Sequence, residues 1–428
     1  MGTTMLPHDA CLAELISFLR TSPTAFHAAA SAAALLRESG FVQLDEQASW
    51  GRLPAGNYFV LRNESSLIGF TWNGGGAFRL IGAHTDSPSL RLKPNPLRKE
   101  QGCLLLGVEI YGGALLRPWF DRELSLAGRV AWQDKNGSLR SALLDVQRPV
   151  AVIPSLAIHL NREANKQQDI NSQTELVPLA GLIGEAATDF QHLLREQLRS
   201  QQPDAEPAGL IDHELFFYDA TPPALAGLHQ EFIVSARLDN LVSCFAAVQA
   251  LRLADAQDNC LIILNDHEEV GSVSAAGAKG PLLRDVLERL LPETEARQAA
   301  LRKSFFISAD NAHAVHPNYA AKHDPQHLPQ LGKGPVIKFN ANQRYATTAA
   351  SAAKFRQLCT KADVPVQEFV SRSDMGCGST IGPLTAAELG VETVDVGIPS
   401  LAMHSIRETA ASVDCWHLCR VLRTFFQP

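Results

Sequence analysis

Hydrophobic and polar residues follow two different periods along this chain. Apolar residues recur every three or four positions across 11–40, which predicts helix with a break at Ser22-Pro23. Short apolar runs follow, and the last of them, FRLIGAHTDSP, has the pattern of a buried strand. Beyond about residue 231, strand-like apolar runs alternate with helix-like segments. This alternation predicts a three-layer α/β/α fold around a mainly parallel sheet.

The middle of the chain has a different pattern. Its segments LLLGVEIYGGALL, LSLAGRVAWQD and SLRSALLDV alternate as antiparallel strands do, and ATDFQHLLREQLRSQ is typical of a helix. We therefore predict that a β-rich domain at 90–231 interrupts an α/β domain formed by 1–89 and 232–428.

Composition excludes several classes of protein. The 428 residues carry a formal net charge of -7 and no basic block, which argues against a nucleic-acid partner. No apolar run approaches the roughly 20 residues that span a membrane, and the first residues lack a signal-peptide pattern. The eight cysteines form no CxxC pair, which favours reduced thiols in a cytoplasmic protein.

Ionisable residues follow five of the predicted strands or adjoining segments. Ligands of open α/β sheets bind outside the carboxyl ends of the strands, so these residues are expected to meet at one edge. Each alone is more typical of a turn or helix cap, but together they indicate a site. The residues are His84 and Asp86, Asp239, the adjacent pair Glu268 and Glu269, Asp310, and His404.

Imidazole and carboxylate groups in this combination suit a pair of zinc ions, or cobalt or manganese. Two divalent ions carry about four positive charges, which three ligand carboxylates and a bridging hydroxide would balance. One of the two adjacent glutamates is then left over and could act as the general base for a hydrolase. Asp86 could hydrogen-bond the far ring nitrogen of His84, or it could serve only as a turn residue before Pro88.

Several long motifs resemble one known family in order and spacing. The resemblance is to the aspartyl aminopeptidase family of dinuclear-zinc exopeptidases, and it covers nearly the whole chain. The motifs are GAHTDSPSLRLKP, SARLDN, NDHEEVGSVSAAGA, ISADNAHAVHPNY, GPVIKFNANQRYATT, CGSTIGP and LAMHSIRE.

The resemblance implies roles for these residues. Asp239 would bridge two zinc ions, and Glu268 would be the general base. The other ligands would be His84 and Asp310 at one ion, and Glu269 and His404 at the other. It also implies that the β-rich insertion is a dimerisation domain and that dimers build a tetrahedral dodecamer with enclosed active sites.

Three further residues gain substrate-binding roles only through the resemblance. Lys338 would meet an acidic substrate side chain, although a solvated strand lysine is an equal alternative. His159 would reach the active site of a neighbouring subunit, and His313 would line the substrate pocket. The run SDMGCGS at 373–379 departs from the expected family sequence, which puts the substrate preference in question.

We therefore expect a cytoplasmic zinc aminopeptidase that removes acidic N-terminal residues from peptides, by means of a metal-activated water and Glu268. A preference for neutral N-terminal residues, or activity as a related carboxypeptidase or deacylase, are the alternatives. Cysteine chemistry at Cys377 and a non-enzymatic scaffold are further rivals. The absence of HExxH and GxSxG motifs argues against single-helix zinc proteases and common serine hydrolases.

Overall fold

A computed structural model describes residues 7–166, 169–184, 189–255 and 257–427. The chain divides into two compact units. The first comprises the chain up to Asp86, Pro223–Met403, and Glu408 onward; the second comprises Ser87–Pro222 and His404–Arg407. The domain boundaries predicted after residues 89 and 231 rest on sequence alone and stay predictions.

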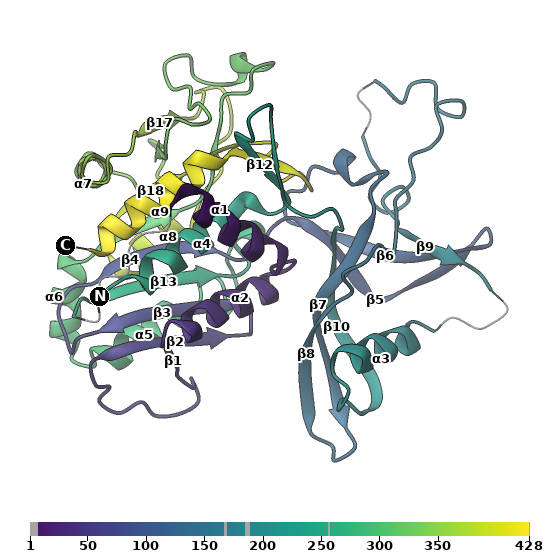
Figure 1. The fold of residues 1–428 in the computed structure, drawn as a ribbon, viewed down its shortest axis with the longest axis horizontal. Helices are drawn as coiled ribbons and strands as arrows, with labels where there is room; N and C mark the ends of the chain where they lie inside the picture. Colours follow the sequence, from purple (N-terminus) through teal and green to yellow (C-terminus); the bar gives the residue numbers. More distant parts are fainter. Residues whose placement is uncertain (1–6, 167–168, 185–188, 256, 428) are drawn as a thin grey trace. The chain divides into compact units, whose positions relative to one another are not determined.

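The first unit is built on a nine-stranded sheet (Figure 1). Five of its eight strand pairings are parallel, so the sheet is mainly parallel as predicted. Its strands, in spatial order, are β1 (Val42–Gln43), β2 (Gly56–Arg62), β3 (Ser66–Trp72), β13 (Cys260–Asn265), β4 (Arg79–His84), β14 (Phe305–Ala309), β18 (Glu392–Gly397), β16 (Val336–Phe339) and β17 (Gln367–Val370).

Successive residues of a strand point to opposite sides of its sheet, so both faces of this sheet present apolar side chains, and helices cover both faces. In β13, Ile262 belongs to one apolar core and Ile263 to another. The first core contains α1 (His8–Arg20), α2 (Ala25–Glu38), α4 (Leu238–Arg252), α7 (Ala349–Lys361) and α9 (Ser412–Phe426); the second contains α5 (Leu282–Leu290), α6 (Thr294–Lys303) and α8 (Ile381–Leu389). The predicted three-layer α/β/α architecture is confirmed. Among the described residues, no helix has the length and apolar character needed to cross a membrane.

A smaller five-stranded sheet completes the first unit. It joins segments that are far apart in the sequence, and its pairing of β12 with β20 sets Ser235 opposite Glu408. In spatial order the strands are β11 (Ala224–Ala226), β12 (Phe232–Ser235), β20 (Glu408–Ala411), β19 (Pro399–Leu401) and β15 (Ala312–His313). Two short 3-10 helices, η2 (Glu268–Val270) and η3 (Ala320–Lys322), also belong to this unit.

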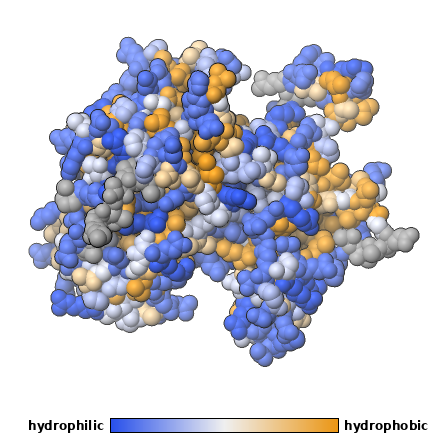
Figure 2. All heavy atoms as spheres, viewed as in Figure 1, coloured by the Kyte–Doolittle hydropathy of each residue, from blue (hydrophilic) through white to orange (hydrophobic). Residues whose placement is uncertain are grey.

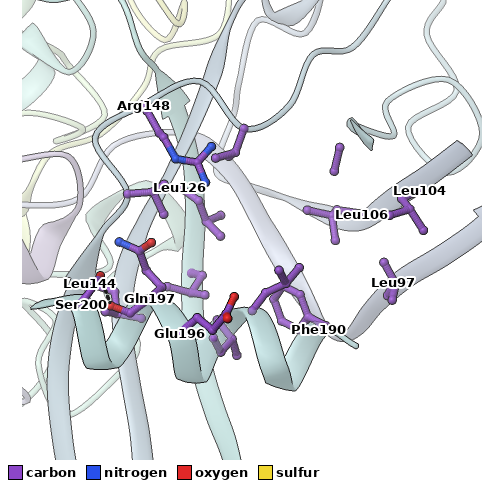
Figure 3. Close-up of a pocket in the computed structure, with 16 residues that line it drawn as sticks. Leu97, Leu104, Leu106, Leu126, Leu144, Arg148, Phe190, Glu196, Gln197 and Ser200 are labelled. Carbon is purple, nitrogen blue, oxygen red and sulfur yellow. Dashed lines mark hydrogen bonds between the residues drawn. The ribbon is translucent and has the colours of Figure 1, made fainter. Parts of the chain in front are cut away.

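The second unit is an antiparallel six-stranded sheet with one α-helix among its described residues, α3 (Phe190–Gln201), and one 3-10 helix, η1 (Arg117–Trp119). The strands, in spatial order, are β8 (Leu139–Asp145), β7 (Leu124–Asp134), β10 (Pro207–Asp219), β5 (Ser89–Glu100), β6 (Cys103–Tyr111) and β9 (Leu179–Leu182). A cavity of about 450 Å³ lies between α3 and the sheet (Figure 3). Its wall is mostly leucine, valine and phenylalanine, with Arg148, Glu196, Gln197 and Ser200 as its polar members.

Candidate metal centre

Three neighbouring parallel strands deliver the site residues to one edge of the main sheet. Strands β13, β4 and β14 lie side by side, so their carboxyl ends meet there. His84 is the last residue of β4, Asp310 directly follows β14, and Glu268 and Glu269 form the turn η2 after β13. Asp239 lies at the start of the buried helix α4, where the backbone of Asp239 and Asn240 is not helical. The Asp239–Asn240 peptide bond is cis.

His84 lies at the centre of a cluster of carboxylates. Its Nε2 atom is 3.4 Å from Oδ1 of Asp239 and 3.5 Å from Oδ1 of Asp310. One ligand-type atom from each of these three side chains falls within 4.8 Å of the others, and the same holds for His84 with Glu268 and Glu269. The structure therefore brings these five predicted site residues together in the first unit, and Asp86 and Lys338 contact members of the cluster.

These separations fit the edges of a metal coordination shell. Tetrahedral ligands bound about 2.1 Å from zinc lie about 3.4 Å from one another. Burial alone would lower the pKa of His84, but Asp239, then Asp310 and Asp86, raise it well above its ordinary value. A metal ion at Nε2 would therefore have to compete with a proton.

Asp86 connects His84 to the Glu268–Glu269 turn. Its two carboxylate oxygens accept hydrogen bonds from the backbone N–H groups of Glu268 and Glu269, both at 3.1 Å. Its backbone carbonyl lies 3.1 Å from Nδ1 of His84, and its carboxylate is 3.4 Å from the same atom. Contacts of this kind orient the ring so that Nε2 faces the carboxylates. Asp86 is thus more than a turn residue.

Glu268 is a partly buried carboxyl group at the edge of this cluster. Burial raises the pKa of Glu268 to about 7; the charge of His84 opposes the rise, and Asp310, Asp86 and Asp239 add to it. The turn that carries Glu268 is flanked by His267 and Gly271, both in the left-handed backbone region. A glycine at position 271 meets that requirement without steric cost.

Lys338 is a buried residue of the site, which excludes the alternative of a solvated strand lysine. It is only 2% exposed, its Nζ lies 3.4 Å from Oδ2 of Asp310, and it stacks over the Tyr345 ring at 5.3 Å. The predicted contact with a substrate carboxylate would have to share this ammonium group with Asp310. That role stays a prediction.

A pocket of about 300 Å³ opens beside His313. Loss of water around the ring, followed by the charge of Lys338, lowers the pKa of His313. Among the described residues, the pocket wall carries basic and imidazole groups but no carboxylate. These groups are His313, His316, Lys322, His323 and Arg372, and the apolar part of the wall includes Tyr345, Phe369, Met375, Leu401 and Met403.

Two predicted site residues lie in the second unit. His404 begins the segment His404–Arg407, and its Nδ1 is 3.1 Å from the carbonyl oxygen of Gly113. His159 is exposed on a turn. Their roles as fifth metal ligand and as contact to a neighbouring subunit stay predictions.

Two buried acids near the site have no counterpart in the sequence-based prediction. Glu408, in β20, accepts a hydrogen bond from the backbone N–H of Asp239 at 2.9 Å. Asp395, in β18, accepts hydrogen bonds from the Ala346 N–H and the Thr380 hydroxyl, both at 2.6 Å. An acid flanked on both sides by valine inside a strand, as in TVDVG, is a signal that could have identified Asp395.

The fold and these side chains define a class: an α/β protein whose sheet edge offers imidazole and carboxylate groups for divalent metal. Comparison with known proteins narrows the class. The family model described as Aminopeptidase I zinc metalloprotease (M18) matches residues 18–426. The chain belongs to this family of zinc metallo-aminopeptidases.

Related proteins align with this chain over nearly its whole length. A probable M18 family aminopeptidase 2 of Pseudomonas entomophila (strain L48) is 55% identical over 424 residues, which cover 98% of each chain. The structure of the Ape4 and Nbr1 complex contains a chain that is 40% identical with a TM-score of 0.93, over 98% of this chain and 86% of that one. The S. cerevisiae mApe1 dodecamer is 27% identical with a TM-score of 0.83, over 98% and 97%.

Proposed function

We propose that this chain is an aminopeptidase that holds two zinc ions at the site around His84 and removes acidic N-terminal residues from peptides. The observation that carries the proposal is the arrangement of Asp239 and Asp310 at 3.4 and 3.5 Å from Nε2 of His84, beside the turn that carries Glu268. Family membership favours an aminopeptidase over a carboxypeptidase or deacylase.

Five side chains would hold the ions. His84 and Asp310 would bind one, Glu269 and His404 the other, and Asp239 would bridge them. When bound, the ions supply Lewis acidity that polarises the attacking water and the scissile carbonyl group. The ligand spacing of His84, Asp239 and Asp310 supports the first of these ions.

Glu268 would move the proton in this reaction. Its raised pKa shows that burial and neighbouring acids disfavour its charged form, and bound cations would oppose that effect and keep it ionised near neutral pH. An ionised Glu268 can take a proton from the attacking water and return it to the leaving amine. Asp86 would hold this glutamate in place through the backbone N–H of the turn.

The charge of the pocket beside His313 supports the acidic preference. Lys322 and Arg372 contribute positively charged side chains to its wall. Arg372 already pairs with Asp374 at 2.7 and 2.9 Å, which reduces the charge that it offers to substrate. The apolar wall, including Phe369 and Met375, supports the second candidate, a preference for neutral N-terminal residues.

A panel of Asp, Glu, Leu and Lys aminoacyl substrates, with metal analysis of the same sample, distinguishes the two candidates. For the acidic preference, we expect the highest kcat/KM with Asp or Glu, and a selective loss for these two in Lys322→Met. Highest activity with Leu, unaffected by that variant, would establish the neutral preference instead.

We also propose that copies of the chain assemble, as in the mApe1 dodecamer, and that His159 reaches a neighbouring active site. Apolar side chains at the surface of the second unit support this proposal (Figure 2). Among the described residues of this unit, the large apolar side chains that are exposed are Ile110, Leu115, Leu139, Leu156, Ile158, Leu160, Leu182, Ile183 and Leu193. Surfaces of this kind mark protein interfaces. Light scattering should give a mass near twelve chains, and a monomer mass at working concentration would refute the assembly.

A further inference from the structure

Two cysteine side chains lie in contact where the first described helix meets the last. Cys11 belongs to α1 and Cys419 to α9, 408 positions apart, and their sulfur atoms are 3.7 Å from each other. They are 3% and 5% exposed. All eight cysteines are free thiols in the structure, and neither of these two belongs to the metal centre.

The geometry favours this pair over other pairings. A disulfide needs the two sulfur atoms to approach to about 2.05 Å, so a pair whose sulfur atoms are already in contact is the natural candidate. Cys415 is also buried nearby, but it lies four residues before Cys419 on the same helix. A bond between Cys415 and Cys419 would require the helix to unwind locally, whereas a bond from α1 to α9 would not.

Cys11 lies close to the start of its helix, and its thiol donates a hydrogen bond to the sulfur of Cys419. Cys11 sits in the first turn of α1, whose N-cap residue, Pro7, makes no side-chain capping hydrogen bond. Opening of this uncapped turn would give an oxidant access to the sulfur.

We propose that Cys11 and Cys419 form a redox modification site, in which a hydroperoxide-class oxidant creates a disulfide that joins α1 to α9. The Cys11 thiolate attacks the terminal peroxide oxygen, the O–O bond breaks, a sulfenic acid forms, and the other oxygen leaves after protonation as an alcohol, or as water when the oxidant is hydrogen peroxide. The Cys419 thiol then attacks the sulfenic sulfur and gives up its proton, the S–O bond breaks, and the sulfenic oxygen leaves as water. The two sulfurs together lose two electrons, and the peroxide gains them. A dithiol reductant reverses the bond.

This bond would act on the unfolded state of the chain. It closes a loop of about 400 residues between the two ends, and longer closed loops lose more entropy on cross-linking. We therefore expect oxidised protein to unfold at a temperature at least about 3 °C higher than reduced protein.

The test uses the full-length wild-type chain treated with stoichiometric hydrogen peroxide. Remaining thiols are blocked, the protein is digested without reductant, and linked peptides are identified by mass spectrometry. We expect a peptide containing Cys11 linked to one containing Cys419, together with the rise in melting temperature, and both should disappear after dithiothreitol. If oxidation instead ends in sulfinic or sulfonic acids without that link, the proposal is wrong.

Serine variants assign the partners. Cys11→Ser and Cys419→Ser should lose the link and the thermal shift, whereas Cys415→Ser should keep both. Cys359→Ser is the matched control, because Cys359 is equally buried but lies in α7. Loss of the link in Cys415→Ser would overturn the pairing. The wild-type peptide map decides the question even where a serine variant fails to fold.

Discussion

Asp86 is a single residue that fixes the backbone of the turn carrying Glu268 and Glu269. It binds their backbone N–H groups, so their side chains stay available to the site. The three carboxylates of Asp86, Glu268 and Glu269 would repel one another without positive charge nearby, and His84, 3.4 Å from Asp86, supplies some of it. The roles proposed for individual residues can be separated by isosteric substitutions.

Glu268→Gln keeps the size of the side chain and removes its ability to take a proton. We expect unchanged metal content and a kcat about 10²- to 10⁴-fold lower, because general-base catalysis contributes about that much. Steady-state kinetics and elemental analysis of the same preparation measure both quantities. Near wild-type turnover would exclude Glu268 as the base, and loss of metal would indicate that it is a ligand instead.

Asp86→Asn replaces one accepting oxygen with an amide group that cannot accept a hydrogen bond from the η2 turn. We expect metal affinity to fall about 10- to 100-fold, as is usual when a residue that orients ligands is changed. Titration of metal-depleted protein with zinc measures the affinity. Asp45→Asn is the control, because Asp45 also accepts a backbone hydrogen bond, from Gln47, but on the surface. Equal affinities in the two variants would remove the positioning role of Asp86.

At the scale of elements, the sequence predicts those helices and strands whose position is determined by the local pattern of apolar residues. Helices α1 and α2 and the strand β4 follow from apolar periodicity, and placing His84 and Asp310 at strand ends follows from the α/β alternation. Contacts made by distant segments have no such local signal. Glu408 binds the backbone of Asp239, 169 positions earlier in the chain, only because β20 pairs with β12.

Gly82 lies in β4, where residues of β14 and α8 pack closely against the strand. A methyl group at this position would lie 2.4 Å from Phe306 and 2.9 Å from Ile381, both fully buried. Gly82→Ala should therefore lower stability by about 1–3 kcal/mol, because overpacking forces the neighbours to move. It should also weaken zinc binding, because His84 is two residues further along the strand.

Thermal unfolding of the purified variant, together with zinc titration, measures these effects. Gly209→Ala in β10 serves as the comparison, since nothing lies within 4 Å of its added methyl group. Identical melting temperatures for the two variants would show that the core around β4 can absorb the methyl group.

For the whole molecule, the α/β/α fold and the family were predictable because long stretches of sequence determine them. The substrate preference was not predictable from the sequence. The basic part of the pocket wall beside His313 comes from η3, which carries Lys322, and from the segment after β17, which carries Arg372; these segments have no hydrophobic period and gain neighbours only in the folded chain. The acids at the metal centre are likewise brought together only by folding.

Metal removal tests how far the folded molecule depends on cations to offset the negative charge of the carboxylates at the metal centre. Two like charges 4 Å apart repel by about 4 kcal/mol at an effective dielectric constant of 20, so cations that bind only the folded centre should stabilise it. We expect chelator treatment to reduce activity at least about tenfold and to lower the melting temperature by several degrees, and zinc to restore both.

The difference in melting temperature between loaded and chelated protein should shrink as pH falls, because protons compete with zinc at His84, whose pKa is raised. Iodoacetamide is the control reagent, because thiol alkylation should spare activity if Cys377 has no catalytic role. Full activity in chelator, with metal content shown to be below one-tenth of a site, would contradict metal-dependent hydrolysis.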